Sequence, residues 1–342
     1  MDSLTQIALG SAVAALIAPA RHRRAALVAG GVLGTLPDLD VIPLALSGAD
    51  PVTLMTWHRG PSHSLFVLAV TGWLLWLGMR RWWTPARQAP ARWLWAIQAA
   101  LLTHPLLDAF TVYGTQLFWP LPGSPVMGAS IFIVDPVYTA PLLVACAVAW
   151  WLRERRAASR WLFASLVLST TYLGWSAAAK GMIELEAQRT LAAEGLQHAP
   201  RLSVPAPFNT LLWRVVVITS DGFLEGERSL LADRGPIVFR RYASDNVALN
   251  KVAEYPSVQR LSWFAQGFLK AEQRDGLLVV SDLRMGAEPD YVFRFAVAES
   301  DGQGGWRRIP VEQLNWPSTD RLRLAGMWKR IWREPDRNGP GI

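Results

Sequence analysis

Three short polar clusters lie within or beside the most apolar stretches of this chain. They are Asp38-Leu39-Asp40, residues 58–63 and residues 104–108. Ionisable side chains are costly in surroundings apolar enough for a bilayer, so such residues usually mark a functional site. Three of the five histidines fall in these clusters, beside three carboxylates. This combination of side chains is typical of a metal centre.

The third cluster places two ligand types at helical spacing. His104 and Asp108 are four residues apart, so on a helix they lie on one face, about 6 Å apart at Cβ. A zinc-binding helix uses the same spacing for its pair of ligands. The alternative is a His–Asp hydrogen bond that braces two helices.

The first cluster contains two carboxylates that cannot share a helix face at a spacing of two. Pro37 and Pro43, with Gly34 before them, predict an unwound segment at membrane depth, which requires burial in protein or a wet cavity. Converging carboxylates repel each other unless a cation lies between them. The alternative for Asp38 and Asp40 is a surface turn outside the bilayer.

The second cluster contains His58, Arg59 and His63. Gly60 permits a tight turn and Pro61 can start the next helix, so both imidazoles can fold back toward one point. Arg59 is suited to bind a pair of anionic oxygens, or alternatively contacts lipid headgroups. Farther along, Asp135 precedes Pro136 and is an extra ligand, a general base or a helix N-cap.

Six apolar segments must position these clusters, and a spanning helix needs about 20 apolar residues. We therefore predict an all-α membrane bundle of about six spans, one or two of them re-entrant. Basic residues concentrate in three connecting loops, 21–24, 80–92 and 153–160, which the positive-inside rule places in the cytoplasm. All three clusters and Asp135 then lie at the outer level. The segments are residues 4–20, 25–46, 64–79, 93–118, 131–152 and 161–179.

The chain changes character at about residue 181. Short β-rich runs punctuated by Gly, Pro and Asp predict a soluble, mainly-β or α+β domain. We therefore expect a transmembrane domain over 1–180 and an extracytoplasmic domain over 181–342. The runs are residues 213–219, 237–242, 277–283 and 291–297.

The charge and cysteine content argue against nucleic-acid binding and against sites built from cysteine. The net charge of +7 comes mostly from membrane-flanking loops rather than from a groove-reading face, so nucleic-acid binding is not expected. Cys146 is the single cysteine, which excludes an intramolecular disulfide and a thiolate metal cluster.

Together, residues 1–6, Leu36-Pro37-Asp38-Leu39-Asp40, residues 58–64 and residues 104–116 resemble a bacterial family. This family comprises the membrane-bound metal-dependent hydrolases, which include LexA-regulated, YdjM/YfhP-like inner-membrane proteins. The resemblance covers residues 1–180 and implies a metal site and hydrolase activity. A more distant similarity, to zinc-dependent phospholipase C and single-strand nucleases, rests on His104 and Asp108. The chain has too few histidines for the three-metal site of those enzymes.

The leading prediction is a hydrolase of the bacterial inner membrane with one or two divalent ions. Zn²⁺ fits best, with Mn²⁺ or Mg²⁺ as alternatives. The ion would lower the pKa of a bound water to about 7. Arg59 would neutralise the negative charge that develops on the substrate, and Asp135 would accept a proton or complete the coordination shell of the metal.

The expected partners are membrane lipid, a small-molecule or lipid phosphoester, and a protein bound by the C-terminal domain. The alternatives are a metal transporter or sensor and a non-enzymatic scaffold. The predicted ligands are Asp38, Asp40, His58, His63, His104 and Asp108.

Overall fold

The structure of the protein is a computed structural model that describes residues 1–315 and 321–334. The chain divides into two compact units, each drawn from two stretches of sequence. The helical unit comprises Met1–Ser47 and Trp57–Ser176, and the sheet unit comprises Gly48–Thr56 and Ala177–Ile342.

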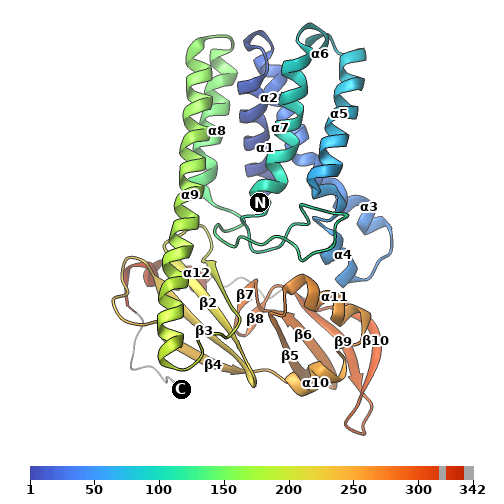
Figure 1. Cartoon of the computed structure of the whole chain (residues 1–342), viewed down its shortest axis with the longest axis vertical. Helices are drawn as coiled ribbons and strands as arrows, with labels where there is room; N and C mark the ends of the chain where they lie inside the picture. Colours follow the sequence, from blue (N-terminus) through green and yellow to red (C-terminus); the bar gives the residue numbers. More distant parts are fainter. Residues whose placement is uncertain (316–320, 335–342) are drawn as a thin grey trace. The chain divides into compact units, whose positions relative to one another are not determined.

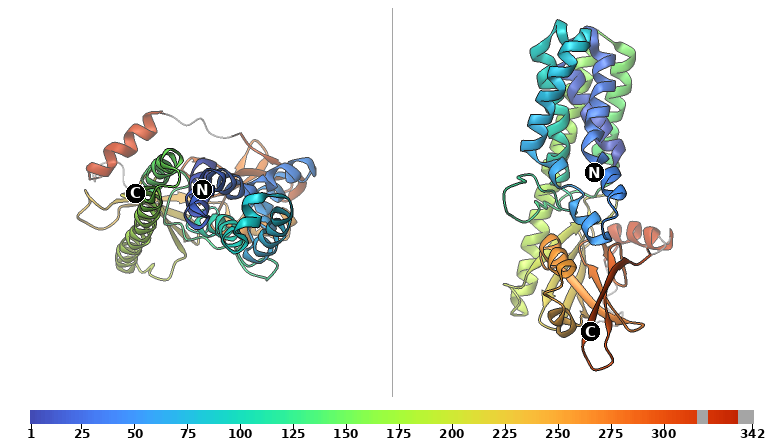
Figure 2. Two further views of the ribbon diagram at one scale, coloured as in Figure 1. Left: turned by 90° about the horizontal axis from the view of Figure 1, so that it is seen from above. Right: turned by 90° about the vertical axis from the view of Figure 1, so that its right-hand side faces the viewer.

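Helices of the helical unit run alongside one another in the side views (Figures 1 and 2). Their core is apolar and well packed, with Trp93, Ile97, Leu101, Leu142 and Leu162 all fully buried. The long helices are α1 (Ser3–Ile17), α2 (Arg23–Thr35), α5 (Leu65–Trp82), α7 (Pro90–Asp108), α8 (Pro136–Leu152) and the first part of α9 (Arg156–Ala193). The short elements are α3 (Val41–Leu46), α6 (Thr84–Gln88) and the 3₁₀ turns η1 (Ala20–His22), η2 (Leu36–Asp40) and η3 (Pro61–His63).

Helices α1 and α2 cross closely because glycines face each other at the crossing. A Cβ atom on Gly30 would lie 2.3 Å from the carbonyl oxygen of Gly10, and one on Gly34 would lie 2.5 Å from that of Gln6. Small residues four apart permit such backbone contact between helices in membranes. This crossing brings Gln6 and the end of α2 together.

We expect Gly30→Ala to destabilise the helical unit by about 1–3 kcal/mol, because the helices must separate to admit the methyl group. Gly78→Ala, in α5, is the matched control, since a Cβ there meets nothing within 4 Å. The control should be neutral or slightly stabilising, because alanine favours helix over glycine. Thermal unfolding in detergent measures both variants, and equal melting temperatures would contradict the prediction.

The prediction of six spans is not supported. Among the described residues, two helical stretches are long and apolar enough to cross a membrane, Ala20–Leu46 and Arg156–Ala193. A third is added if Pro51–His63 and Leu65–Trp82, bent by 55°, form one span. The 15 residues of α1 and 17 of α8 rise only about 22 and 26 Å, against about 30 Å of hydrocarbon. The predicted span 93–118 is also interrupted, since α7 ends at Asp108.

The C-terminal β-sheet domain is confirmed. Two antiparallel four-stranded sheets have the strand orders β1-β2-β3-β4 and β10-β9-β6-β5, and β7 pairs with β8. The strands are β1 (Arg201–Pro205), β2 (Leu212–Thr219), β3 (Gly222–Ser229), β4 (Phe239–Ala243), β5 (Leu269–Arg274), β6 (Leu277–Asp282), β7 (Gly286–Ala287), β8 (Asp290–Tyr291), β9 (Arg294–Ser300) and β10 (Trp306–Gln313). The helices are α4 (Pro51–Trp57), whose residues up to Thr56 belong to this unit, α10 (Asn246–Lys251), α11 (Pro256–Ala265) and α12 (Arg321–Trp332).

The end of α9 forms a core with the first sheet. Ile183 and Leu191 of this helix are buried in one cluster with Trp213, Val215 and Leu224. These helix residues are eight apart and therefore lie on one face. The apolar inner face of β2 thus acquires the partner layer that a sheet needs for independent stability.

Candidate metal centre

Four side chains converge inside the helical unit. Asp38 comes from η2, His63 from η3, and His104 and Asp108 from the end of α7. One ligand atom from each residue lies within 4.8 Å of those of the other three. His63, His104 and Asp108 are fully buried, and the Asp38 side chain is 18% exposed. We call these four residues the metal cluster.

Five of the six ligand–ligand distances in the metal cluster are close to those of a tetrahedral ligand set. Nε2 of His63 lies 3.3 Å from Oδ1 of Asp38 and 3.3 Å from Oδ2 of Asp108. Nε2 of His104 lies 3.3 and 3.4 Å from the same two oxygens, and the two Nε2 atoms are 3.1 Å apart. Nitrogen and oxygen ligands bonded at about 2.0–2.1 Å to a tetrahedral Zn²⁺ lie about 3.3 Å from each other.

Hydrogen bonds around the metal cluster also fit a cation at its centre. Nδ1 of His104 lies 2.5 Å from the carbonyl oxygen of Gly34, so it carries the proton that it donates, and a neutral ring then presents a lone pair on Nε2. Oδ1 of Asp38 and Oδ2 of Asp108 are buried and accept no hydrogen bond from the described residues. Buried carboxylate oxygens without hydrogen bonds are costly, and a divalent cation would satisfy both, adding at Oδ2 of Asp108 to the charge of the Arg59 guanidinium 3.2 Å away.

The local backbone explains why Asp38 and Asp40 separate. Residues 36–40 form the 3₁₀ turn η2, with Pro37 at its start, and this geometry has three residues per turn. Side chains two apart in such a turn point in different directions. Asp38 therefore joins the metal cluster, while Asp40 turns toward the segment that contains His58.

Asp40 and His58 form a hydrogen-bonded pair next to the metal cluster. Oδ1 of Asp40 lies 2.8 Å from Nδ1 of His58. Oδ2 of Asp40 accepts hydrogen bonds from the Ser62 hydroxyl at 2.5 Å and from the Arg59 amide at 3.2 Å. The structure thus does not place Asp40 and His58 among the four converging ligand atoms, although both were predicted as ligands. His58 keeps 22% of its side chain exposed.

Arg59 lies inside the site rather than at its rim. It is 4% exposed, its Nε lies 3.2 Å from Oδ2 of Asp108, and its Nη1 donates to the Thr111 hydroxyl at 3.0 Å. The guanidinium lies over the ring of Tyr113, 4.9 Å from its centroid. Arg59 also has a φ of 62°, so the left-handed turn falls here and not at Gly60. Gly60 is needed for close approach, since a Cβ there would lie 2.8 Å from the Trp57 carbonyl oxygen.

Asp135 caps a helix. Its Oδ1 accepts hydrogen bonds from the amides of Val137 and Tyr138 at 2.9 and 3.2 Å, and its Oδ2 accepts one from the Tyr172 hydroxyl at 2.9 Å. Of the three roles considered for this residue, the geometry matches the N-cap of α8.

We therefore expect Asp135→Ala to lower the stability of the helical unit by about 1–2 kcal/mol, the usual cost of losing an N-cap. Metal content per folded chain should stay unchanged. Thermal unfolding and elemental analysis of the same sample measure the two quantities. A metal-free but folded Asp135→Ala protein would instead make Asp135 part of the metal centre.

Residues near the N-terminus complete the surroundings of Asp108. The Gln6 amide donates to Oδ1 of Asp108 at 3.0 Å and to the His104 carbonyl at 3.3 Å. The amino group of Met1 also donates to Oδ1 of Asp108. Sequence reasoning assigned no role to Gln6, although a glutamine within the apolar run of α1 was a signal that could have identified it.

One comparison with known proteins identifies the first half of the chain. A model of the YdjM inner membrane protein family matches residues 1–183. The chain belongs to this family. The resemblance to YdjM-like inner-membrane proteins is thereby confirmed, and the matched residues include the whole metal cluster with Asp40, His58 and Arg59. No curated protein and no solved structure matches the chain.

The YdjM match ends at residue 183, inside α9 and before the first strand. The strands of the sheet unit therefore lie outside the part of the chain that defines the family. Membership makes this an inner membrane protein, in agreement with its apolar helices.

Proposed function

We propose that this protein is a metal-dependent hydrolase of the inner membrane that acts on a phosphoester or a lipid-like ester. The observation that carries the proposal is the metal cluster, two imidazole nitrogens and two carboxylate oxygens that lie within 4.8 Å of one another in a largely buried site. Asp38, His63, His104 and Asp108 would hold the ion. Zn²⁺ suits this mixed nitrogen and oxygen set best, and Mn²⁺ is the alternative.

The ion would polarise the scissile ester oxygen and activate water for attack. The protein supplies the remaining parts. Gly34 fixes the tautomer of His104, and Gln6 holds one oxygen of Asp108, which leaves the other oxygen for the ion. Such supporting hydrogen bonds orient metal ligands and tune their basicity.

Two further groups would serve the reaction itself. Arg59, 3.2 Å from Asp108, keeps a positive charge beside the metal cluster and would stabilise negative charge that develops on the substrate. Asp40 fixes Nδ1 of His58, so the Nε2 atom of this partly exposed ring is left to exchange protons with substrate or solvent.

Elemental analysis and turnover together test the proposal. Protein purified in detergent should contain about one ion per chain and hydrolyse a chromogenic phosphodiester or a phospholipid in mixed micelles. Chelation should abolish hydrolysis and added Zn²⁺ should restore it. Full metal occupancy without hydrolysis of either substrate, combined with metal flux in proteoliposomes, would favour a transporter instead.

We also propose that the sheet unit faces the outside of the inner membrane, because with three spans the basic loops 21–24, 80–92 and 153–160 all fall on the cytoplasmic side and the last span leads outward. A single cysteine at exposed Gln303, introduced in a Cys146→Ser background, should react with a membrane-impermeant maleimide in spheroplasts. Labelling only after lysis would place this unit in the cytoplasm.

A further inference from the structure

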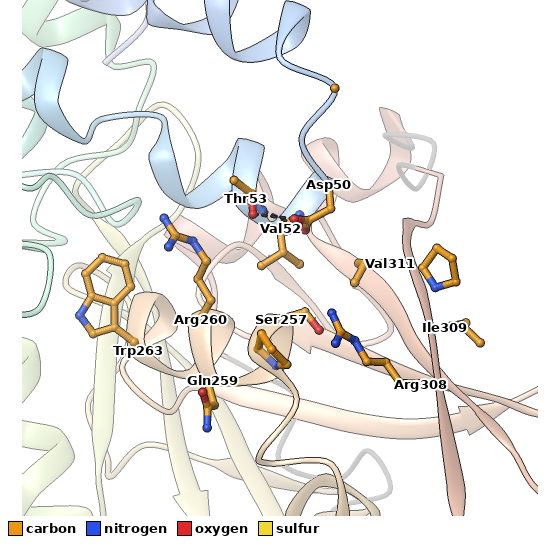
Figure 3. A pocket seen from close by; sticks show the side chains of 13 residues that line it. Asp50, Val52, Thr53, Ser257, Gln259, Arg260, Trp263, Arg308, Ile309 and Val311 are labelled. Carbon is orange, nitrogen blue, oxygen red and sulfur yellow. Dashed lines mark hydrogen bonds between the residues drawn. The ribbon is translucent and has the colours of Figure 1, made fainter.

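A pocket of about 920 Å³ lies within the sheet unit, and none of its lining residues belongs to the metal cluster. Three segments form its walls (Figure 3). They are residues 48–53, residues 256–263 of α11, and residues 308–311 of β10. The regular pairing of β10 with β9 is interrupted between Arg308 and Glu312, and such irregular strand segments often form binding surfaces.

The start of α11 presents donors that lack acceptors. Ser257 is 92% buried, and its hydroxyl has no hydrogen-bond partner among residues 1–315 and 321–334. The N-cap residue Tyr255 contributes no side-chain hydrogen bond to the helix. The first amides of a helix have no intrahelical acceptor, so those of Ser257 and Val258 are available to an anion together with the Ser257 hydroxyl.

Positive charge exceeds negative charge in the pocket. Arg308 has no acidic partner among the described residues, and in Figure 3 its guanidinium and the Ser257 hydroxyl both point into the hollow. Arg260, the second arginine of the lining, donates to the Thr56 hydroxyl. The single acidic lining residue, Asp50, is engaged in capping α4, where it accepts from the amides of Val52 and Thr53 at 3.0 and 3.1 Å.

We propose that this pocket binds a phosphoryl group. A tetrahedral oxyanion has enough acceptor positions for the Ser257 hydroxyl, the uncapped amides of α11 and the fork of Arg308 at once. Trp263, Ile309 and Val311 line the same hollow and provide apolar contact for the organic part of a phosphomonoester. Two arginines alone do not form the extended basic stripe that nucleic acid requires.

Isothermal titration of the full-length protein in detergent tests the proposal. EDTA is included so that the metal cluster does not bind the anion. The probes are inorganic phosphate, glycerol 3-phosphate and nanodiscs that contain phosphatidic acid. Binding of either soluble probe indicates a free phosphate compound as the ligand, and binding of the nanodiscs alone indicates a lipid headgroup. Ser257→Ala and Arg308→Gln should each weaken binding at least 10-fold.

Arg307→Gln is the matched control, because Arg307 is next to Arg308 on β10 but pairs with Glu299 at 2.8 Å and does not line the pocket. It should leave the affinity unchanged. The proposal is overturned if the wild-type protein binds none of the probes. It is also overturned if Arg307→Gln weakens binding as much as Arg308→Gln does, since the effect would then be general surface charge.

Discussion

Protein carrying His104→Ala is expected to lose its metal, with an affinity at least 100-fold below that of the wild type. The reason is that Nε2 of His104 is one of the four converging ligand atoms, and even the removal of residues that only orient ligands lowers metal affinity 10–100-fold. Hydrolysis should fall in parallel because every step that needs the ion is lost. Elemental analysis after dialysis against a weak chelator measures the change.

A second variant distinguishes ligand loss from misfolding. Alanine at position 104 leaves the Gly34 carbonyl without the imidazole proton that it accepts, so the fold itself is at risk. Asp38→Asn keeps the volume of the side chain and removes only its charge, at a position that is partly exposed. It should lose metal to a similar degree while its thermal unfolding stays close to that of the wild type.

The matched histidine control is His22→Ala. His22 lies outside the metal cluster, where it bonds Gln88 at 3.0 Å, and its replacement should leave metal content and turnover unchanged. Stoichiometric metal in both His104→Ala and Asp38→Asn would contradict the assignment of the metal cluster.

His58→Gln should keep its metal, unlike His104→Ala, but lose catalytic activity. Turnover should fall about 10²–10⁴-fold, the usual contribution of a general acid or base. Glutamine can keep a hydrogen bond to Asp40 but cannot exchange a proton near neutral pH. Asp40→Asn should act in the same direction because it removes the carboxylate that fixes the histidine tautomer.

Measuring metal and turnover on the same sample decides between two roles for this pair. If the wild-type protein contains two ions and His58→Gln only one, His58 and Asp40 hold a second ion, and their prediction as metal ligands is confirmed. If the variant keeps both metal and activity, the pair has no part in the chemistry.

The residues of the metal cluster could be predicted from the sequence because ionisable side chains are conspicuous within apolar segments. Every member of the metal cluster was among the predicted ligands. The sequence could not predict that Asp40 and His58 lie apart from this group, because their position depends on the 3₁₀ geometry of η2. Gln6 was missed for a different reason. It carries no charge and lies in an apolar helix, and its role depends on the packing of α1 against α7, which brings its amide to Asp108 and to the His104 carbonyl.

The number of membrane-spanning helices could not be predicted from the sequence, because hydropathy does not determine where a helix ends. The predicted segment 93–118 is predominantly apolar, yet α7 ends at Asp108 and the backbone from 109 to 135 forms turns and an isolated bridge. In the sheet unit the apolar strands β2 and β6 coincide with predicted runs. Strand β3 does not, since Glu225, Glu227 and Arg228 make it polar, and it forms by pairing with β2.

The two stretches of the sheet unit have a consequence for how the protein can be divided. Residues 48–56 belong spatially to this unit, although they lie inside the family match. They bring Asp50 and Val52 to the pocket wall and Thr56 to Arg260. A gene fragment that starts at residue 181 would therefore encode an incomplete domain with an open wall. Study of the C-terminal half in isolation requires residues 48–56 to be grafted back, and an exchange of C-terminal domains between proteins would have to carry this segment with it.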